Sequence, residues 1–210
     1  MAGTCEEKIL QAAGYRLVAG VDEVGRGCWA GPVVAAAVIL PPDILDDLAL
    51  LRGIDDSKTL GAAARARQAA RIRQLALAVG VGAVPAHLID LFGIATATRW
   101  AMIQAVLALP VIPDALLIDW VRLPELPLPQ HSLPRADAVS VSVAAASIIA
   151  KVQRDSLMIA WGRYDPRYQW AAHKGYGTAA HQRALDQHGI SALHRRSFKP
   201  MLSLQPASHS

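Results

Sequence analysis

The chain has 210 residues, of which 53% are hydrophobic and 18% are charged, and this composition excludes a disordered or collagen-like protein. Its two cysteines exclude a disulfide framework and favour a reducing cytosol. The longest uncharged apolar stretches, 28–40 and 138–150, are too short to cross a bilayer, and the first residues lack the basic-then-apolar order of a secretory signal. We therefore expect a globular, cytoplasmic protein with no membrane partner.

Strands and helices are expected to alternate along the chain. Buried apolar runs predict strands over 16–21, 32–40, 79–84 and 115–118. Helical patterns cover 62–78, 94–109, 137–161 and 179–188. Turn-forming and polar residues predict loops over 51–60, 121–134 and 164–178, and a disordered tail from 203. This order indicates an α/β layered fold, and because no linker divides the chain, residues 1–210 are expected to form a single domain.

Positive charge is concentrated in one part of the chain. Residues 151–200 contain nine Lys or Arg and three Asp or Glu, whereas the rest is slightly acidic and the whole chain carries a net charge of +4. A basic region beside a nearly neutral body suggests a polyanionic partner, with nucleic acid as the first candidate. An ordinary solvated face is the alternative, and charge alone does not decide between them.

Four carboxylates stand at unusual places in this pattern. Asp22 and Glu23 follow the first expected strand, Asp119 follows the strand at 115–118, and Asp137 opens the long helix. Charges at the ends of buried strands are costly unless something compensates them, and a hard divalent cation compensates several carboxylates at once. Each acid has an ordinary alternative as a cap or loop residue. Together with a glycine turn and the basic region, they favour a metal-dependent phosphodiester site.

Several longer motifs occur in a specific order. The run at 19–38 reads AGVDEVGRGCWAGPVVAAAV, and it is followed by DSK at 56–58 and LLIDW at 116–120. Three more motifs follow: RADAVSVSVAAASIIAKVQRD, HKGYGT and HRRSF. These segments resemble the type 2 ribonucleases H, specifically bacterial ribonuclease HII. The resemblance covers about residues 15–200.

This resemblance implies a fold, an activity and a metal site. The fold would be ribonuclease H-like, with a mixed central sheet flanked by helices and a helical C-terminal portion. The activity would be cleavage of the RNA strand of RNA/DNA hybrids and cleavage 5′ to single ribonucleotides in duplex DNA, which leaves 3′-hydroxyl and 5′-phosphate ends and serves ribonucleotide removal. The active-site acids would be Asp22, Glu23, Asp119 and Asp137, holding two Mg²⁺ or Mn²⁺ ions roughly 3.5–4 Å apart.

The resemblance also implies how the substrate is recognised. In the family, the glycine turn and the tyrosine of the HKGYG segment read the junction between RNA and DNA, where the 2′-hydroxyl distinguishes ribose. Lysines of the matching segments would contact phosphates, which fixes the duplex without reading its sequence. The alternative to a nucleic-acid contact is that Tyr176 is an aromatic residue packed in its loop. For Lys151 the alternative is an ordinary solvated position on a helix. The expected nucleic-acid contacts are Gly25, Arg26, Gly27, Ser57, Lys58, Lys151, Lys174 and Tyr176.

One departure from the family pattern lies at the site itself. Trp120 follows Asp119, where the family usually has glycine or another small residue. A bulky indole beside the metals could narrow the site, so a hybrid-binding relative with impaired cleavage is the main alternative. A resolvase or a type 1 ribonuclease H, which share the fold, is a weaker one. We expect the protein to act as a monomer.

Overall fold

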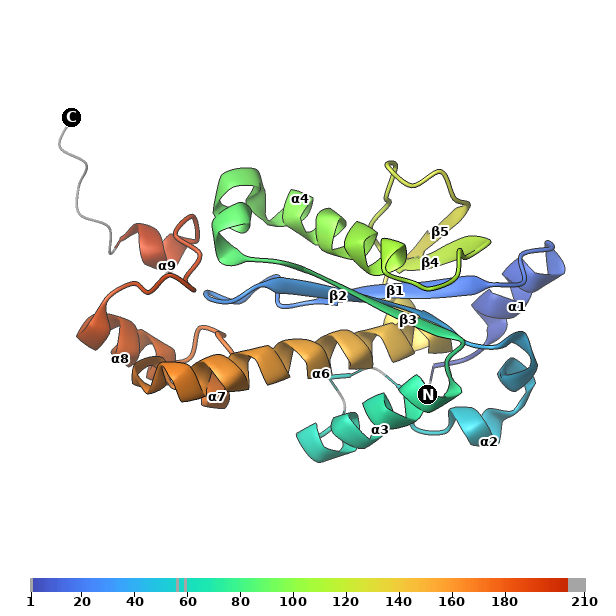
Figure 1. Cartoon of the computed structure of the whole chain (residues 1–210), viewed down its shortest axis with the longest axis horizontal. Coiled ribbons are helices and arrows are strands. Elements are labelled where there is room, and N and C mark those ends of the chain that lie inside the picture. The colour runs from blue at the N-terminus through green and yellow to red at the C-terminus, as the bar shows by residue number, and fades with distance from the viewer. Residues whose placement is uncertain (1, 56, 59, 204–210) are drawn as a thin grey trace.

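The computed structural model describes residues 2–55, 57–58 and 60–203 and is built around one mixed five-stranded sheet (Figure 1). Strand order is β3-β2-β1-β4-β5. The strands are β1 (Val18–Val24), β2 (Val33–Ile39), β3 (Ala78–Val84), β4 (Ala115–Asp119) and β5 (Gln130–Leu133). β1 and β3 run antiparallel to β2, whereas β4 runs parallel to both β1 and β5. Asp56 and the expected tail beyond Ser203 lie outside the described residues.

Helices cover both faces of this sheet. α4 (Ala86–Leu107) lies on one face, and α6 (Val141–Tyr164) with α3 (Ala62–Leu75) lies on the other (Figure 1). Side chains alternate between the two faces along each strand. In β2, Ala35 and Ala37 pack toward α4, whereas Ala36 and Val38 pack toward α6. The α/β fold with a mixed, helix-flanked sheet is therefore confirmed.

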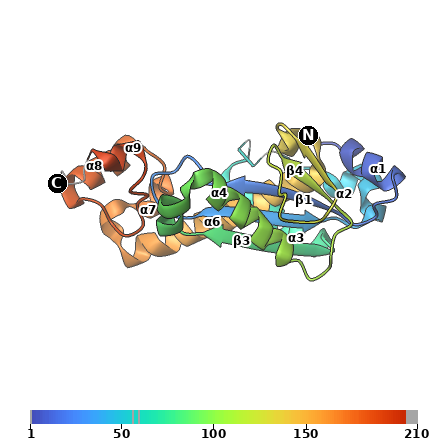
Figure 2. The same ribbon diagram turned by 90° about the horizontal axis from the view of Figure 1, so that it is seen from above.

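The remaining helices lie mainly at the two ends of the sheet (Figure 2). α1 is at one end, and the C-terminal helices α7, α8 and α9 are at the other, which confirms the helical C-terminal portion. These elements are α1 (Cys5–Ala12), η1 (Pro42–Asp46), α2 (Leu48–Leu51), α5 (Ala136–Val139), η2 (Pro166–Tyr168), α7 (Trp170–His173), α8 (Ala179–His188) and α9 (Lys199–Leu202). In the described part of the chain, no helix has the length and apolar character needed to cross a membrane.

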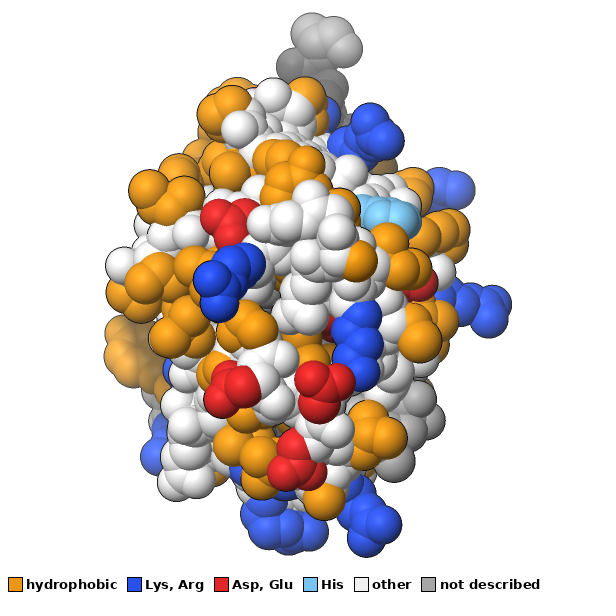
Figure 3. Space-filling view, turned by 90° about the vertical axis from the view of Figure 1, so that its right-hand side faces the viewer, with side chains coloured by type: hydrophobic (Ala, Val, Ile, Leu, Met, Phe, Trp, Pro, Cys, Tyr) orange, Lys and Arg blue, Asp and Glu red, His pale blue; other side chains and the backbone are white. Residues whose placement is uncertain are grey.

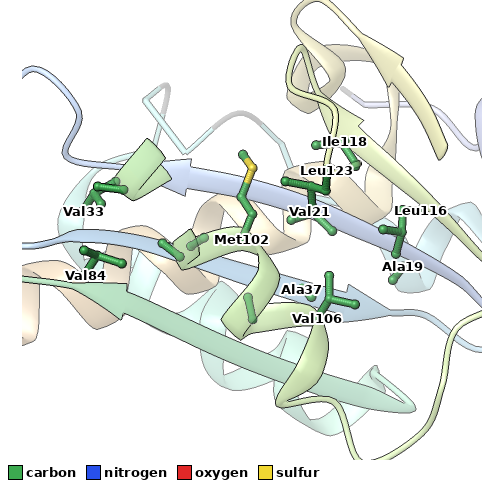
Figure 4. Close-up of a cluster of buried hydrophobic side chains, with 14 of the residues drawn as sticks. Ala19, Val21, Val33, Ala37, Val84, Met102, Val106, Leu116, Ile118 and Leu123 are labelled. Carbon is green, nitrogen blue, oxygen red and sulfur yellow. The ribbon is translucent and has the colours of Figure 1, made fainter. Parts of the chain in front are cut away.

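Small residues let both long helices approach the sheet closely. On the α4 side, Met102 and Val106 point toward Ala19, Val21 and other buried strand residues (Figure 4). On the α6 side, a Cβ added at Gly20 would lie 2.2 Å from the carbonyl carbon of Ser142. Glycine is needed at this position because the α6 backbone occupies the space of a side chain. This contact fixes the start of α6 against β1, two residues before Asp22.

Several boundaries differ from those expected from the sequence. β1 continues through Val24 because Asp22 and Glu23 still pair with Ala36 and Ala35 of β2, so both acids lie within the strand and not after it. The helix expected at 94–109 begins at Ala86, with a break at Gly93 where φ is +79°.

Two expected loops contain regular secondary structure, and one expected helix is divided into two. The loop at 121–134 contains β5, and the loop at 164–178 contains η2 and α7. The expected helix 137–161 consists of α5 and α6, which meet at Ser140. The Ser140 hydroxyl accepts a hydrogen bond from the backbone N–H of Val143 at 3.2 Å and so caps α6.

The α1 end of the molecule carries a mixed surface. Figure 3 views this end, and acidic, basic and hydrophobic side chains are interspersed on it. Among the described residues, no single type of side chain covers the face that is visible in this view. This end therefore offers no uniformly basic surface for a polyanion.

Two buried histidines tie α8 to the loops that precede and follow it. His194 Nδ1 accepts the backbone N–H of Ser191 at 2.9 Å, so its Nε2 carries the proton and donates to His181 Nε2 at 3.0 Å. His181 Nδ1 must then carry a proton, which it donates to the carbonyl of Tyr176 at 2.9 Å. Both rings are neutral in this arrangement, and the chain of bonds ends at the loop that carries Tyr176.

This arrangement predicts a specific response to acid. Burial lowers the pKa of His181 and of His194 from 6.5 to about 4. In the unfolded chain both titrate near 6.5, so their contribution to the free energy of unfolding is complete above pH 6.5 and is lost as the pH falls toward 4. That contribution amounts to roughly 3 kcal/mol at most for each ring.

Long-range ¹⁵N–¹H spectra measure this directly. From about pH 7 to about pH 5 they should show neutral rings, with the proton on Nε2 of His194 and on Nδ1 of His181. A titration midpoint near the ordinary histidine value for either ring would contradict the assignment.

Candidate active site

Two parallel strands bring the carboxylates together. The register pairs Val21 of β1 with Ile118 of β4, so the next residues, Asp22 and Asp119, lie side by side. The Ala136 backbone N–H donates to Asp119 Oδ1 at 2.8 Å, which ties the first turn of α5 to the end of β4. Asp137 follows in that turn and is buried. β1, β4 and α5 therefore contribute all four acids to one region.

Asp22 and Glu23 point to opposite faces of the sheet because β1 is regular at this point. Asp22 is buried and bonds to the hydroxyl of Ser147 on α6. Glu23 faces the α4 side, where Arg26 Nη1 lies 3.6 Å from Glu23 Oε1. Adjacent residues of an extended strand point to opposite sides unless the chain bends, and the unbroken pairing with β2 shows that β1 does not bend here.

The electrostatics of the group are unfavourable for carboxylate charge. Burial raises the pKa of Asp22 well above its usual value, and the charges of Glu23 and Asp119 raise it further. The pKa of Glu23 is raised mainly by burial, although Arg26 opposes this shift. Burial, followed by the charge of Asp137, also raises the pKa of Asp119. The protein thus holds several like charges together with too little compensation.

These acids fit divalent metal ions by their chemistry. Carboxylate oxygens are the ligands of hard cations, and Glu23 Oε2 is buried with no hydrogen-bond partner. Within the described residues, no group of three or more His, Cys, Asp or Glu side chains is arranged to hold an ion by itself. An ion here would therefore need oxygens from water or substrate phosphate as well, which is the usual situation for Mg²⁺.

The α6 side of the acids carries a lysine and a buried serine. Lys58 Nζ lies 3.2 Å from Asp137 Oδ2, and 78% of its side chain is exposed. Ser57 lies inside the protein, where its hydroxyl is 2.9 Å from the hydroxyl of Ser147. In this position Ser57 supports the loop that presents Lys58.

Tyr176 lies in a basic cleft farther along α6. The cleft has a volume of about 420 Å³ and is lined in part by Lys151, Lys174 and Tyr176. Lys151 Nζ lies 5.4 Å from the centre of the Tyr176 ring and also pairs with Asp155 at 2.8 Å. Tyr176 is 39% exposed, so its side chain is only partly packed against the protein and part of it is accessible in the cleft.

Two buried arginines support the glycine turn. Arg154 is fully buried and donates to the carbonyls of Ala30, Pro32 and Lys174 at 3.0, 2.9 and 2.8 Å. Gly25 has φ +91°, and a Cβ there would lie 2.2 Å from Arg154 Nε, so this position requires glycine. One guanidinium thus holds both the segment after the turn and the segment before Tyr176.

Arg195, also fully buried, supports the turn from the C-terminal side. Its guanidinium donates to the carbonyls of Arg26 and Gly31 at 2.7 and 3.0 Å. Sequence reasoning missed the supporting role of Arg154. The available signal was its helical spacing of four residues from both Ala150 and Met158, which places a charge on an apolar face.

Trp120 lies directly beside this group. Its φ is +47°, its side chain is 58% exposed, and the Arg26 guanidinium carbon lies 5.1 Å from the ring centre. The indole lines a cleft together with Ala95, Thr98 and Arg99 of α4, so it lies on the α4 side of the acids.

Comparison with known proteins identifies the family. The family model for ribonuclease HII matches residues 19–201. A ribonuclease HII from Herpetosiphon aurantiacus is 67% identical over 199 residues, which cover 95% of this chain and 96% of that protein. The chain belongs to the ribonuclease HII family. As a member of that family, it is a metal-dependent endoribonuclease.

Solved structures agree with the fold. Ribonuclease H2 from Pyrococcus horikoshii superimposes with a TM-score of 0.75 at 22% identity, over 90% of this chain and 96% of that one. The Mn²⁺ complex of Bst-RNase HIII superimposes with a TM-score of 0.70 at 24% identity, over 90% of this chain and 68% of that one. Both likenesses concern the fold.

The crowded carboxylates predict that charge removal stabilises the protein when no metal is bound. In EDTA at neutral pH, Asp22→Asn should unfold at a higher temperature than the wild type, by roughly 2–4 °C for each kcal/mol of repulsion and desolvation removed. The raised pKa of Asp22 predicts the direction of this change in Tm, because folding disfavours the ionised form that the substitution removes. Thermal unfolding followed by circular dichroism measures the difference.

Asp165→Asn is the matched control. Arg167 lowers the pKa of Asp165, so the ionised form is favourable there and its removal should give no increase in Tm. If Asp22→Asn were no more stable than the wild type in EDTA, the electrostatic account of the site would be wrong.

Proposed function

We propose that this ribonuclease cuts the RNA strand of RNA/DNA hybrids and also cuts 5′ to a single ribonucleotide in duplex DNA, leaving 3′-hydroxyl and 5′-phosphate ends. The observation that carries the proposal is the group of four carboxylates, three of which have raised pKa values. Such a group is costly for an isolated protein and suited to phosphodiester cleavage with divalent ions. The family membership supports the same activity.

The four acids are proposed to hold two divalent ions, Mg²⁺ or Mn²⁺. Asp22, Glu23 and Asp119 would be direct ligands, and Asp137 would complete the site. When bound, such ions supply Lewis acidity that lowers the pKa of the attacking water and stabilises the leaving 3′-oxygen. The Mn²⁺ complex of Bst-RNase HIII, which has the same fold, supports this choice of ions.

The protein's own residues orient the acids and the substrate. Ser147 and the backbone N–H of Glu23 bond to Asp22, and the Ala136 N–H bonds to Asp119, so these carboxylates have fixed directions. Lys58 lies at Asp137, where it can also contact a phosphate. Held groups need no reorganisation during the reaction, which is the main advantage of such a site.

Recognition of the ribose is assigned to the glycine turn and Tyr176. Gly27 is exposed and a Cβ there would touch nothing within 4 Å, so the fold itself does not require glycine at this position. A glycine in open space lets a ligand approach the backbone closely. Backbone groups of Gly25, Arg26 and Gly27 would then read the 2′-hydroxyl, and the Tyr176 ring would pack on the neighbouring sugar.

Phosphate contacts are assigned to Lys58, Lys151 and Lys174. Lys151 and Lys174 line the cleft at Tyr176, and Lys58 lies at the acids, so the three follow the α6 side of the molecule. The protein would act as a monomer. In it, these three lysines would position the duplex without reading its sequence.

The direct test uses a labelled DNA duplex with one internal ribonucleotide. With Mg²⁺ or Mn²⁺ the wild type should cut 5′ to the ribonucleotide, and EDTA should abolish the cut. Asp119→Asn and Asp137→Asn should each reduce kcat by roughly 100-fold or more. Asp186→Asn, which alters an exposed carboxylate on α8, should leave the rate unchanged.

Two results would overturn parts of this proposal. Tight hybrid binding with no cleavage of any hybrid would establish the binding-only alternative. Cleavage by Asp119→Asn at the wild-type rate would remove that residue from the metal site.

A further inference from the structure

We propose that a cleft next to Trp120 forms a second contact for the nucleic acid, which binds a phosphodiester group and the adjoining sugar on the α4 side of the acids. The proposal rests on the nuclease function above and extends it. The cleft has a volume of about 290 Å³ and is lined by Arg26, Ala95, Thr98, Arg99, Trp120, Val121 and Arg122. It begins directly after Asp119 and is closed on one side by α4.

The position of the cleft complements the contacts already assigned. Lys58, Lys151, Lys174 and Tyr176 all lie on the α6 side of the sheet. A duplex whose scissile phosphate sits at the acids extends in both directions from that point. The assigned lysines lie only on the α6 side, whereas the Trp120 cleft offers arginines to a backbone that leaves the acids on the α4 side.

The charges of the cleft fit a phosphodiester. Three arginines line it, and the described structure pairs two of them with carboxylates: Arg26 with Glu23 at 3.6 Å and Arg99 with Glu125 at 3.2 Å. Both pairs are open to solvent, because 30% of the Arg26 side chain and 40% of the Arg99 side chain are exposed, so a phosphate can reach either guanidinium. The two free oxygens of a phosphodiester match the planar fork of a guanidinium.

Trp120 adds an aromatic wall to these charges. Its φ of +47° lies in the left-handed region, which is unfavourable for a bulky side chain. Its indole is 58% exposed, so burial in the core does not account for its presence there. Arg26 lies across one side of the ring at 5.1 Å. An exposed aromatic ring bordered by arginines is the usual surface for the sugars and bases of a nucleic acid.

The test separates the ring from the backbone conformation. Trp120→Gly suits a positive φ and removes the ring, whereas Trp120→Phe keeps an aromatic ring. With the single-ribonucleotide duplex, Trp120→Gly should raise KM about 10-fold and leave kcat within about 3-fold, and Trp120→Phe should stay close to wild type. Fluorescence anisotropy in EDTA should show the same loss of duplex affinity, independent of catalysis.

The arginines are tested through their salt dependence. Arg122→Ala should reduce the slope of log affinity against log salt by about one phosphate contact. Arg163→Ala, which removes an exposed arginine near the end of α6 and outside the cleft, is the matched control and should leave affinity and slope unchanged.

The possible outcomes distinguish this inference from the proposed function. If the wild type cuts and both Trp120→Gly and Arg122→Ala bind and cut normally, the cleft is no subsite. An increase in kcat for Trp120→Gly at unchanged KM would show that the indole only narrows the metal site. Failure of the wild type to cut would instead refute the nuclease proposal, while anisotropy would still report on the cleft.

Discussion

Repulsion among carboxylates at the ends of β1 and β4 is the constraint on which this structure depends. The parallel register places Asp22 beside Asp119, and α5 adds Asp137. The surrounding contacts offset this repulsion in part: Ser147 bonds to Asp22, Arg26 pairs with Glu23, and Lys58 pairs with Asp137. The pKa values of Asp22, Glu23 and Asp119 remain raised. The fold therefore sacrifices stability at the place where it would bind metal, as functional sites often do.

Two buried arginines organise the proposed recognition elements around this group. Arg154 and Arg195 are fully buried, and the bonds described above run from their guanidinium groups to backbone carbonyls. Carbonyl oxygens can satisfy a guanidinium if enough of them converge on it. The glycine turn and the Tyr176 loop are about 150 residues apart in the sequence, and Arg154 holds them in one geometry. Rigid support of this kind suits the proposed role of these segments, which is to distinguish ribose from deoxyribose by one hydroxyl.

Much of the fold was predictable, because long apolar runs and ordered motifs carry strong signals. β5 was missed because its four residues, QHSL, are all partly buried and show no apolar alternation. The prediction that the first strand ends before Asp22 was wrong, because backbone pairing with β2 continues through Asp22 and Glu23. The four acids could be grouped through the family resemblance, but the opposite directions of Asp22 and Glu23 follow from strand regularity that only the structure shows. The supporting role of Arg154 depends on tertiary carbonyl contacts, which no local pattern encodes.

The most direct test of the central claim is a Mn²⁺ titration followed by electron paramagnetic resonance. It should be carried out on the protein alone and with a nicked duplex that carries the 5′-phosphate ribonucleotide product. If the four acids form an incomplete metal site that substrate oxygens complete, the nicked duplex should tighten Mn²⁺ binding, and Asp119→Asn should remove most of that effect. Mn²⁺ affinity that is the same with and without the duplex, or unchanged in Asp119→Asn, would contradict the account.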